Sequence, residues 1–304
     1  MDTARLRLAR LRRIALLCAV LLAAVTSLSA FLRHSASGLG CHPWPACYGQ
    51  GDRAVASGAG AEAVTAVGAA RLAHRITATL SLLGTIALVV LSLVRRPMLR
   101  REAALSLALL TLAMSLALLG IFTPGARVPA VAMANLLGGF VMLALAARLA
   151  APPPRVRLGA TAIAVAALLL GQAATGALVS ASHAGLACTD LLECTAQARA
   201  AGWDWQSLAP WREPVVAVGT PHAEGALAQW LHRLGSFVVA PAVALLGATA
   251  WHRGRRRAGA ALLGLLTVEV AIGLVIGSTG LPLVPVLLHN LGTALMLAIV
   301  VRLV

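Results

Sequence analysis

Eight apolar segments, each about as long as a lipid bilayer is thick, dominate this sequence. They fall near residues 14–33, 66–94, 103–122, 130–148, 158–181, 224–250, 258–278 and 284–302. A membrane-spanning helix needs about 20 mostly apolar residues, because the hydrocarbon core offers no water to backbone polar groups. Hydrophobic residues make up 60% of the chain and charged residues 12%, unlike the balance of a soluble domain. The sequence therefore predicts an all-α polytopic membrane protein with eight transmembrane helices.

Arginine supplies nearly all of the positive charge, because the chain contains no lysine, and its distribution indicates the topology. The arginines gather in four short stretches, residues 5–13, 95–101, 148–157 and 253–257. Cytoplasmic loops of membrane proteins carry such an excess of basic residues. We expect a protein of the bacterial inner membrane with both termini cytoplasmic and two long loops, 34–65 and 182–223, outside. This clustering argues against nucleic-acid binding as the reason for the net charge of +15.

The chain contains one short pattern twice, with the same C-x5-C spacing in each copy. Residues 38–47 read GLGCHPWPAC and residues 185–194 read GLACTDLLEC. Each copy precedes an apolar segment with a His-Arg pair, His74-Arg75 in the first case and His232-Arg233 in the second. A period of about half the chain indicates a duplicated domain rather than a solenoid of short repeats. We expect two pseudo-symmetric four-helix bundles, formed by residues 1–151 and 152–304.

The first apolar segment has an alternative interpretation as a cleaved signal peptide. It has a basic start, an apolar core and the small residues Ser29 and Ala30 near its end. Its counterpart, residues 158–181, precedes the second cysteine motif in the same way and cannot be a signal peptide. The repeat therefore favours a membrane helix over residues 14–33.

Four of the five cysteines belong to the repeated motif: Cys41 with Cys47, and Cys188 with Cys194. On the predicted topology both pairs face an oxidising compartment, so each pair is a candidate disulfide. Free thiols and metal ligands are the alternatives, although zinc sites use shorter spacings with further ligands. Whether such bridges staple a loop or take part in redox chemistry stays open. Cys18, in the middle of a span, is expected to be a small core residue.

Three of the eight histidines lie inside predicted spans, at similar depth in the outer half of the membrane: His74, His232 and His289. Ionisable residues within a membrane are costly and usually functional. Two imidazoles that project into one helix bundle are the arrangement for bis-histidine haem ligation. His232 and His289 are thus candidate ligands of haem b iron, and Arg233 is a candidate partner of a haem propionate. Hydrogen bonds to neighbouring helices are the alternative role for these histidines.

The first half departs from this arrangement at its last helix. Aligning residues 134–143 with residues 288–297 places Asn135 opposite His289. Asparagine is a poor ligand for haem iron, so the first half offers His74 as a metal ligand and leaves the opposite position open. Closed haem sites move electrons, whereas sites with an open position can bind substrate or carry out chemistry.

These features together resemble the haem A synthase family, over essentially the whole chain. The passages SGLGCHPWPACYG and TGALVSASHAGLACTDLLEC look like the family's outer-loop signatures. The resemblance implies an oxidoreductase whose C-terminal bundle binds haem b through His232 and His289. Its N-terminal bundle would hold haem O, whose C8 methyl group is hydroxylated successively to a formyl group. The product is haem A for cytochrome c oxidase.

The resemblance also implies partners and further contacts. Arg75, the counterpart of Arg233, is expected to contact the haem of the first half. Haem O synthase, assembly factors of cytochrome c oxidase, membrane lipid and a second copy of the chain are the expected partners.

Two residues of the first half differ from the family's pattern. The family has E-x-x-H-R on its second helix, whereas Arg71 occupies the glutamate position before His74. It has a histidine before a leucine on its fourth helix, where this chain has Asn135. We therefore expect His74, Asn135 and Arg71 to surround the substrate, and Arg71 is also a candidate ligand of a propionate. Outer-loop residues that can compensate for the altered pair are His34, His42, Glu62 and His183, and the alternative is that each is a solvated loop residue.

Two alternative functions stay open at this point. The first is a non-catalytic haem b protein that serves haem handling or electron relay during assembly of respiratory complexes. The second is a transporter built from internal repeats, although its expected broken helices have no matching signal in both halves.

Overall fold

All regular secondary structure among the residues that the computed structural model describes is helical. The described residues are 3–36, 61–94, 98–123, 128–153, 157–188, 190–213 and 225–304. The long helices are α1 (Thr3–Ala36), α3 (Ala61–Leu93), α4 (Arg100–Phe122), α5 (Pro129–Ala150), α6 (Gly159–Ala181), α8 (Ala226–His252), α9 (Arg256–Thr279) and α10 (Leu283–Val301). Between α6 and α8 lie the short elements η1 (Ala184–Leu186), α7 (Leu191–Ala200) and η2 (Trp205–Leu208).

Eight of the described helices are long and apolar enough to cross a membrane, and each overlaps one of the predicted segments over most of its length. The prediction of an all-α integral membrane protein with eight spans is confirmed. The first helix is longer than its apolar segment, since α1 already begins at Thr3. The reason is that the arginine-rich start consists largely of Arg, Leu and Ala, which all favour the helical conformation.

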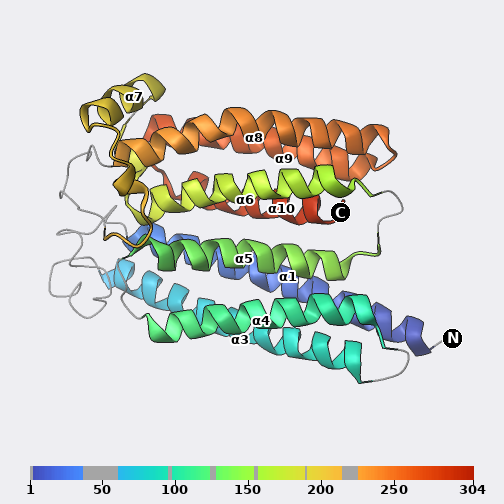
Figure 1. The fold of residues 1–304 in the computed structure, drawn as a ribbon. Helices are drawn as coiled ribbons and strands as arrows, with labels where there is room; N and C mark the ends of the chain where they lie inside the picture. The colour runs from blue at the N-terminus through green and yellow to red at the C-terminus, as the bar shows by residue number, and fades with distance from the viewer. Residues whose placement is uncertain are drawn as a thin grey trace.

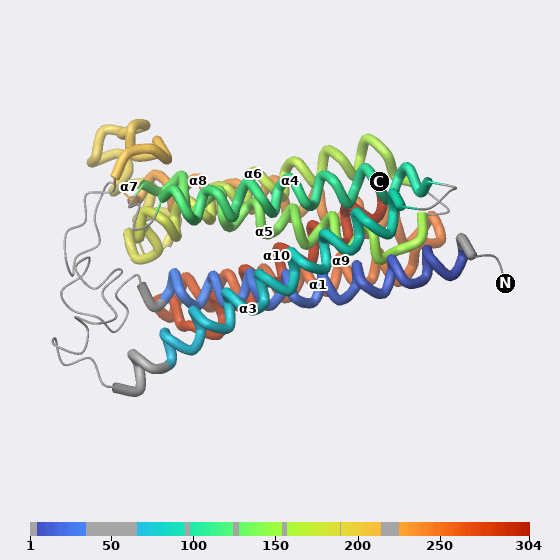
Figure 2. Tube along the Cα trace, turned by 90° about the horizontal axis from the view of Figure 1, so that it is seen from below, coloured from blue at the N-terminus to red at the C-terminus, as the bar shows by residue number. Residues whose placement is uncertain are grey.

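Within each half, the four long helices pack in the order of the sequence. In the first half, α1 packs on α3, α3 on α4, α4 on α5, and α5 returns to α1 (Figures 1 and 2). In the second half, α6, α8, α9 and α10 follow the same order, and α10 returns to α6. The second and fourth helices of each half therefore stand at opposite corners. The exact twofold relation and the boundary between residues 151 and 152 stay predictions.

The two halves share one hydrophobic core, in which α5 is the most deeply placed helix of the first half. They meet through contacts among α1, α5, α6 and α10. Gly139 on α5 lies so close to Thr26 on α1 that a Cβ atom there would come within 3.0 Å of Thr26 Cγ2. Small residues let membrane helices approach closely, and here they allow dispersion contacts to hold the helices together.

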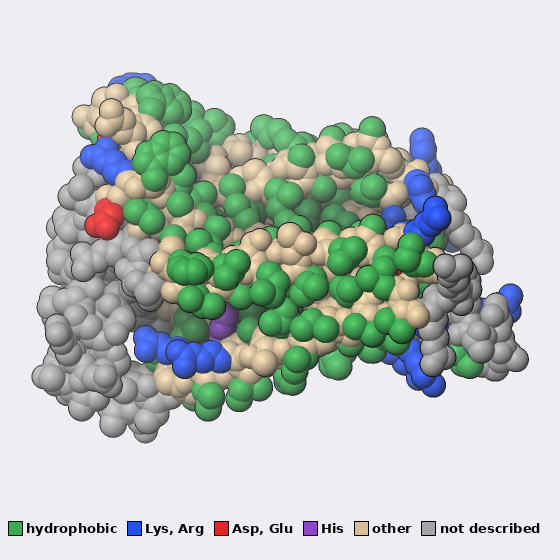
Figure 3. Space-filling model, turned by 60° about the horizontal axis from the view of Figure 1, so that its bottom comes forward, with side chains coloured by type: hydrophobic (Ala, Val, Ile, Leu, Met, Phe, Trp, Pro, Cys, Tyr) green, Lys and Arg blue, Asp and Glu red, His purple; other side chains and the backbone are tan. Residues whose placement is uncertain are grey.

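The two ends of the molecule differ in character. Both chain ends lie at one end, and α7 lies at the other (Figure 1). Hydrophobic side chains cover the middle of the face in Figure 3, and arginines gather towards its ends. The amide of Ala130, at the start of α5, donates a hydrogen bond of 2.7 Å to the carbonyl of Pro210. The segment between α6 and α8 therefore reaches the first half. The assignment of the two ends to cytoplasm and exterior stays a prediction.

Candidate functional site

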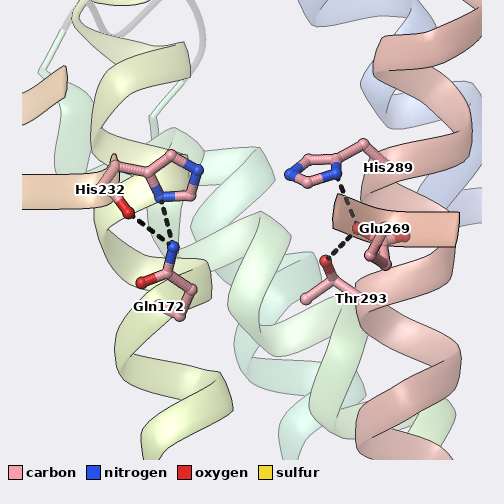
Figure 4. Close-up of polar contacts among 5 residues, drawn as sticks. All are labelled: Gln172, His232, Glu269, His289 and Thr293. Carbon is pink, nitrogen blue, oxygen red and sulfur yellow. Dashed lines mark hydrogen bonds and ion pairs between the residues drawn. The ribbon is translucent and has the colours of Figure 1, made fainter. Parts of the chain in front are cut away.

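The imidazole rings of His232 on α8 and His289 on α10 face each other across the second bundle (Figure 4). Their ring centroids are 6.5 Å apart and their planes are nearly perpendicular, at 89°. An imidazole nitrogen binds a metal at about 2 Å and lies about 1 Å from its ring centre, so two rings on one metal have centroids about 6 Å apart. The gap between the two rings therefore fits one metal ion.

The described residues place few other metal ligands near this pair. No group of three or more His, Cys, Asp or Glu side chains among them is arranged to hold a metal ion. Two opposed imidazoles suit an iron whose remaining ligands come from a porphyrin, because haem needs only axial ligands from the protein. The donor set thus fits haem better than a bare metal ion.

Polar residues of α6 contact one ring nitrogen of His232, Nδ1. The hydroxyl of Thr175 donates to the carbonyl of Gln172 at 2.8 Å and lies 3.1 Å from Nδ1. The side-chain NH2 group of Gln172 donates to the His232 carbonyl at 2.8 Å and lies 3.2 Å from Nδ1, where it can only donate. The other ring nitrogen, Nε2, faces His289 in Figure 4 and is directed at the gap between the rings. When Nε2 binds a metal, Nδ1 carries the ring proton, and the Thr175 hydroxyl is then its acceptor.

His289 has a charged partner. Its Nδ1 lies 2.7 Å from a carboxylate oxygen, Oε2, of Glu269 on α9. The contact is short but its alignment falls outside that of a regular hydrogen bond. The hydroxyl of Thr293, one turn further along α10, donates to the same oxygen at 3.3 Å. A proton on Nδ1 faces this carboxylate, and Nε2 of His289 is then the free ligand atom.

In the first half the candidate residues are more widely spread. His74, half-buried on α3, has its Nε2 3.3 Å from the hydroxyl of Ser29 on α1. Arg71 and Arg75 are exposed and lie one turn apart on α3. Asn135 is half-buried on α5, at the opposite corner from α3. Within the described part of the chain, no hydrogen bond links Asn135 to His74, and no ring contact like that between His232 and His289 involves His74.

Comparison with known protein families gives a match that covers nearly all of the chain. A sequence model of the COX15-CtaA family, described as cytochrome oxidase assembly protein, matches residues 12–301. The chain belongs to this family. No curated protein matches the chain. The resemblance to haem A synthases is confirmed at the level of the family, and membership gives the chain a role in cytochrome oxidase assembly through haem A synthesis.

The described cysteine motif of this COX15-CtaA protein forms a buried disulfide. Cys188 and Cys194 are bonded, with Cα atoms 5.2 Å apart, so this predicted bridge is confirmed. Both cysteines are buried, at 4% and 0% exposed, against apolar residues of α6, η1 and α8. These apolar residues cover the disulfide and keep it from solvent. The predicted Cys41–Cys47 bridge lies outside the described residues. Cys18 is free and buried in α1, as expected of a core residue.

Arg233 connects this cysteine motif to the bundle. Its guanidinium donates to the carbonyl of Cys188 at 3.2 Å. One turn earlier on α8, the amide of Gln229 donates to the carbonyl of Gly185 at 2.9 Å. The segment between α6 and α8 is therefore anchored to α8 next to His232. The expected contact of Arg233 with a propionate stays a prediction.

Of the four candidate compensating residues, the structure describes the side chains of two. His34 lies in the last turn of α1, and His183 directly precedes η1. His42 and the side chain of Glu62 lie outside the described residues.

Sequence reasoning missed three polar residues that contact the two histidines. Gln172 and Thr175 on α6 hold His232, and Glu269 on α9 contacts His289. A signal for the last was present, because Glu269 is an acid inside an otherwise apolar run, and such residues are usually functional. Gln172 and Thr175 lie three residues apart on one helix face, a weaker signal that many membrane helices share.

Proposed function

We propose that this COX15-CtaA protein binds haem b between His232 and His289 and oxidises the C8 methyl group of haem O to a formyl group. The product is haem A for cytochrome c oxidase. The observation that carries the proposal is the pair of opposed imidazoles, whose 6.5 Å centroid separation leaves room for one iron atom. When bound, haem b supplies one-electron redox chemistry at this position.

The residues around the pair orient both imidazoles for binding iron. Thr175 and Gln172 contact Nδ1 of His232, and Glu269 contacts Nδ1 of His289. Each ring therefore presents Nε2 to the gap between the rings, and the partners of Nδ1 fix the orientation of the ring when iron binds.

The first bundle supplies the site for the substrate, haem O. We assign His74 to one face of the substrate and leave the other face open, because Asn135 replaces a ligand there. Arg71 and Arg75 are exposed on the same helix as His74, where their guanidinium groups can pair with the substrate's propionates. Arg233 is the corresponding propionate partner in the second bundle.

This activity sets the expected surroundings of the protein. We propose a location in the bacterial inner membrane, with both termini in the cytoplasm and the cysteine loops outside. Haem O synthase is the expected source of substrate, assembly factors of cytochrome c oxidase the expected recipients of product, and a second copy of the chain a further partner.

Haem extraction tests this function directly. The full chain is expressed together with a haem O synthase, purified in detergent, and its haems are separated by chromatography and identified by mass. We expect haem b in the protein and haem A among the products. Haem b without haem A, where another haem A synthase produces it under the same conditions, would contradict the oxidation and favour a non-catalytic haem protein. Protein without any haem would contradict both assignments.

A further inference from the structure

The two histidines of the candidate haem site have chemically different partners. His232 contacts a neutral amide and a neutral hydroxyl, from Gln172 and Thr175. His289 contacts a carboxylate, from Glu269. The site is thus electrostatically asymmetric, although the two imidazoles face each other at the same depth.

The fold places the Glu269 carboxylate closely against α10. A Cβ atom at Gly292 would overlap the carboxylate, so only glycine leaves space for it at this point of α10. Glu269 is 5% exposed, and its second oxygen, Oε1, is buried without a hydrogen-bond partner among the described residues. A buried carboxylate is costly unless it is paired, and its nearest partner is Nδ1 of His289.

We propose that Glu269 is a positioning residue that lowers the reduction potential of the haem held by His232 and His289. This inference rests on the proposed haem b site. A carboxylate behind a metal-bound imidazole makes the imidazole a stronger donor and fixes its orientation. Both the stronger donor and the nearby negative charge favour Fe(III) over Fe(II), so more reducing conditions are needed to add one electron.

The test compares the midpoint potential of purified holoprotein with that of Glu269→Gln. Glutamine keeps the shape and an acceptor oxygen but removes the charge. A redox titration with dithionite and ferricyanide, followed by the visible absorption of the haem, measures the Fe(III)/Fe(II) equilibrium. We expect equal haem content and a shift of the equilibrium towards Fe(II) by about tenfold, which is about 59 mV for one electron.

Two further variants separate charge from packing. Glu269→Asp keeps the charge and is expected to shift the potential less than Glu269→Gln. Thr267→Val, on an exposed face of the same helix where the hydroxyl bonds only to the Leu263 carbonyl, is expected to leave the potential unchanged.

The outcomes distinguish this inference from the proposed function. Wild-type protein that lacks haem would contradict the proposed function itself. Wild-type protein with haem, combined with an unchanged potential in Glu269→Gln, would overturn only the role of Glu269. An equal shift in Glu269→Asp would assign the effect to packing. Loss of haem from Glu269→Gln would also overturn the inference, because the two histidines are proposed to hold haem without the charge.

Discussion

A Cβ atom on Gly176 would lie 2.8 Å from Cε1 of His232, so the backbone of α6 supports one side of this imidazole directly. Real Cβ atoms essentially never approach a neighbour so closely, and the ring would have to move. The position of a proposed haem ligand is thus fixed by the absence of a side chain on the neighbouring helix. Five residues earlier on α6, nothing lies within 4 Å of a Cβ atom built on Gly171.

The first prediction uses this pair of glycines. Gly176→Leu is expected to displace the His232 ring and to lower haem b content, because overpacking costs about 1–3 kcal/mol, or about tenfold in affinity. Gly171→Leu, which places the same side chain in open space, is the matched control. Haem content per protein in purified samples measures both. Equal haem content in the two variants would contradict the contact.

The histidine pair itself gives the second prediction. His232→Ala and His289→Ala are each expected to abolish the low-spin b-type spectrum, because a bis-histidine site needs both axial nitrogens. His252→Ala, at the exposed end of α8, controls for the general loss of a histidine. Visible spectra of the purified proteins in the reduced state provide the measurement. A wild-type spectrum in both variants would rule out this pair as haem ligands.

Removal of one hydroxyl tests the role of Thr175 in holding His232. Thr175→Val keeps the shape but removes the hydroxyl that accepts from Nδ1–H when Nε2 binds a metal, and an unsatisfied buried donor costs about 1–3 kcal/mol. We expect haem affinity to fall by about tenfold, measured by haem titration of the apoprotein. Thr249→Val, whose exposed hydroxyl bonds only to its own helix, should bind haem as wild type does. Equal affinities in the two valine variants would argue against the assigned hydrogen bond.

The fourth prediction separates the two halves. His74→Ala is expected to lower haem A production by about tenfold while haem b content stays at the wild-type level, because it removes the proposed ligand of the substrate haem and with it about 1.4 kcal/mol of binding free energy. His232→Ala, in contrast, should remove both pigments. Extraction and chromatography of haems from the two variants measure the difference. Unchanged haem A in His74→Ala would remove this residue from the substrate site.

The disulfide gives the fifth prediction. Opening the Cys188–Cys194 loop by Cys188→Ser is expected to destabilise the protein by about 2 kcal/mol, because the bridge restricts the unfolded chain. Thermal unfolding in detergent measures the loss. Cys18→Ser, at the free buried cysteine, leaves the bridge intact and controls for loss of a sulfur. Alkylation of Cys188 or Cys194 in wild-type protein without reductant would contradict the bridge.

The fold could be predicted from the sequence because its strongest determinant, the length of each apolar run, is local. The Cys188–Cys194 bridge was expected from the short spacing of the two cysteines, which is also a local feature, together with the predicted topology. The partners of the histidines could not be predicted in this way. Contact between Glu269 and His289 depends on how α9 and α10 rotate against each other, and the space left by Gly292 becomes visible only when the two helices are packed. The apolar pattern does not determine how each helix is rotated about its axis, because lipid-facing and core-facing residues are equally hydrophobic.

The hydrogen bond from Ala130 to Pro210 limits how far this protein can be treated as two modules. The segment between α6 and α8 contacts the start of α5 in the first half, five residues from Asn135. The shared core likewise draws on both copies. Each half therefore depends on the other for part of its contacts, and a fragment with only one half would expose the apolar surface that the shared core covers.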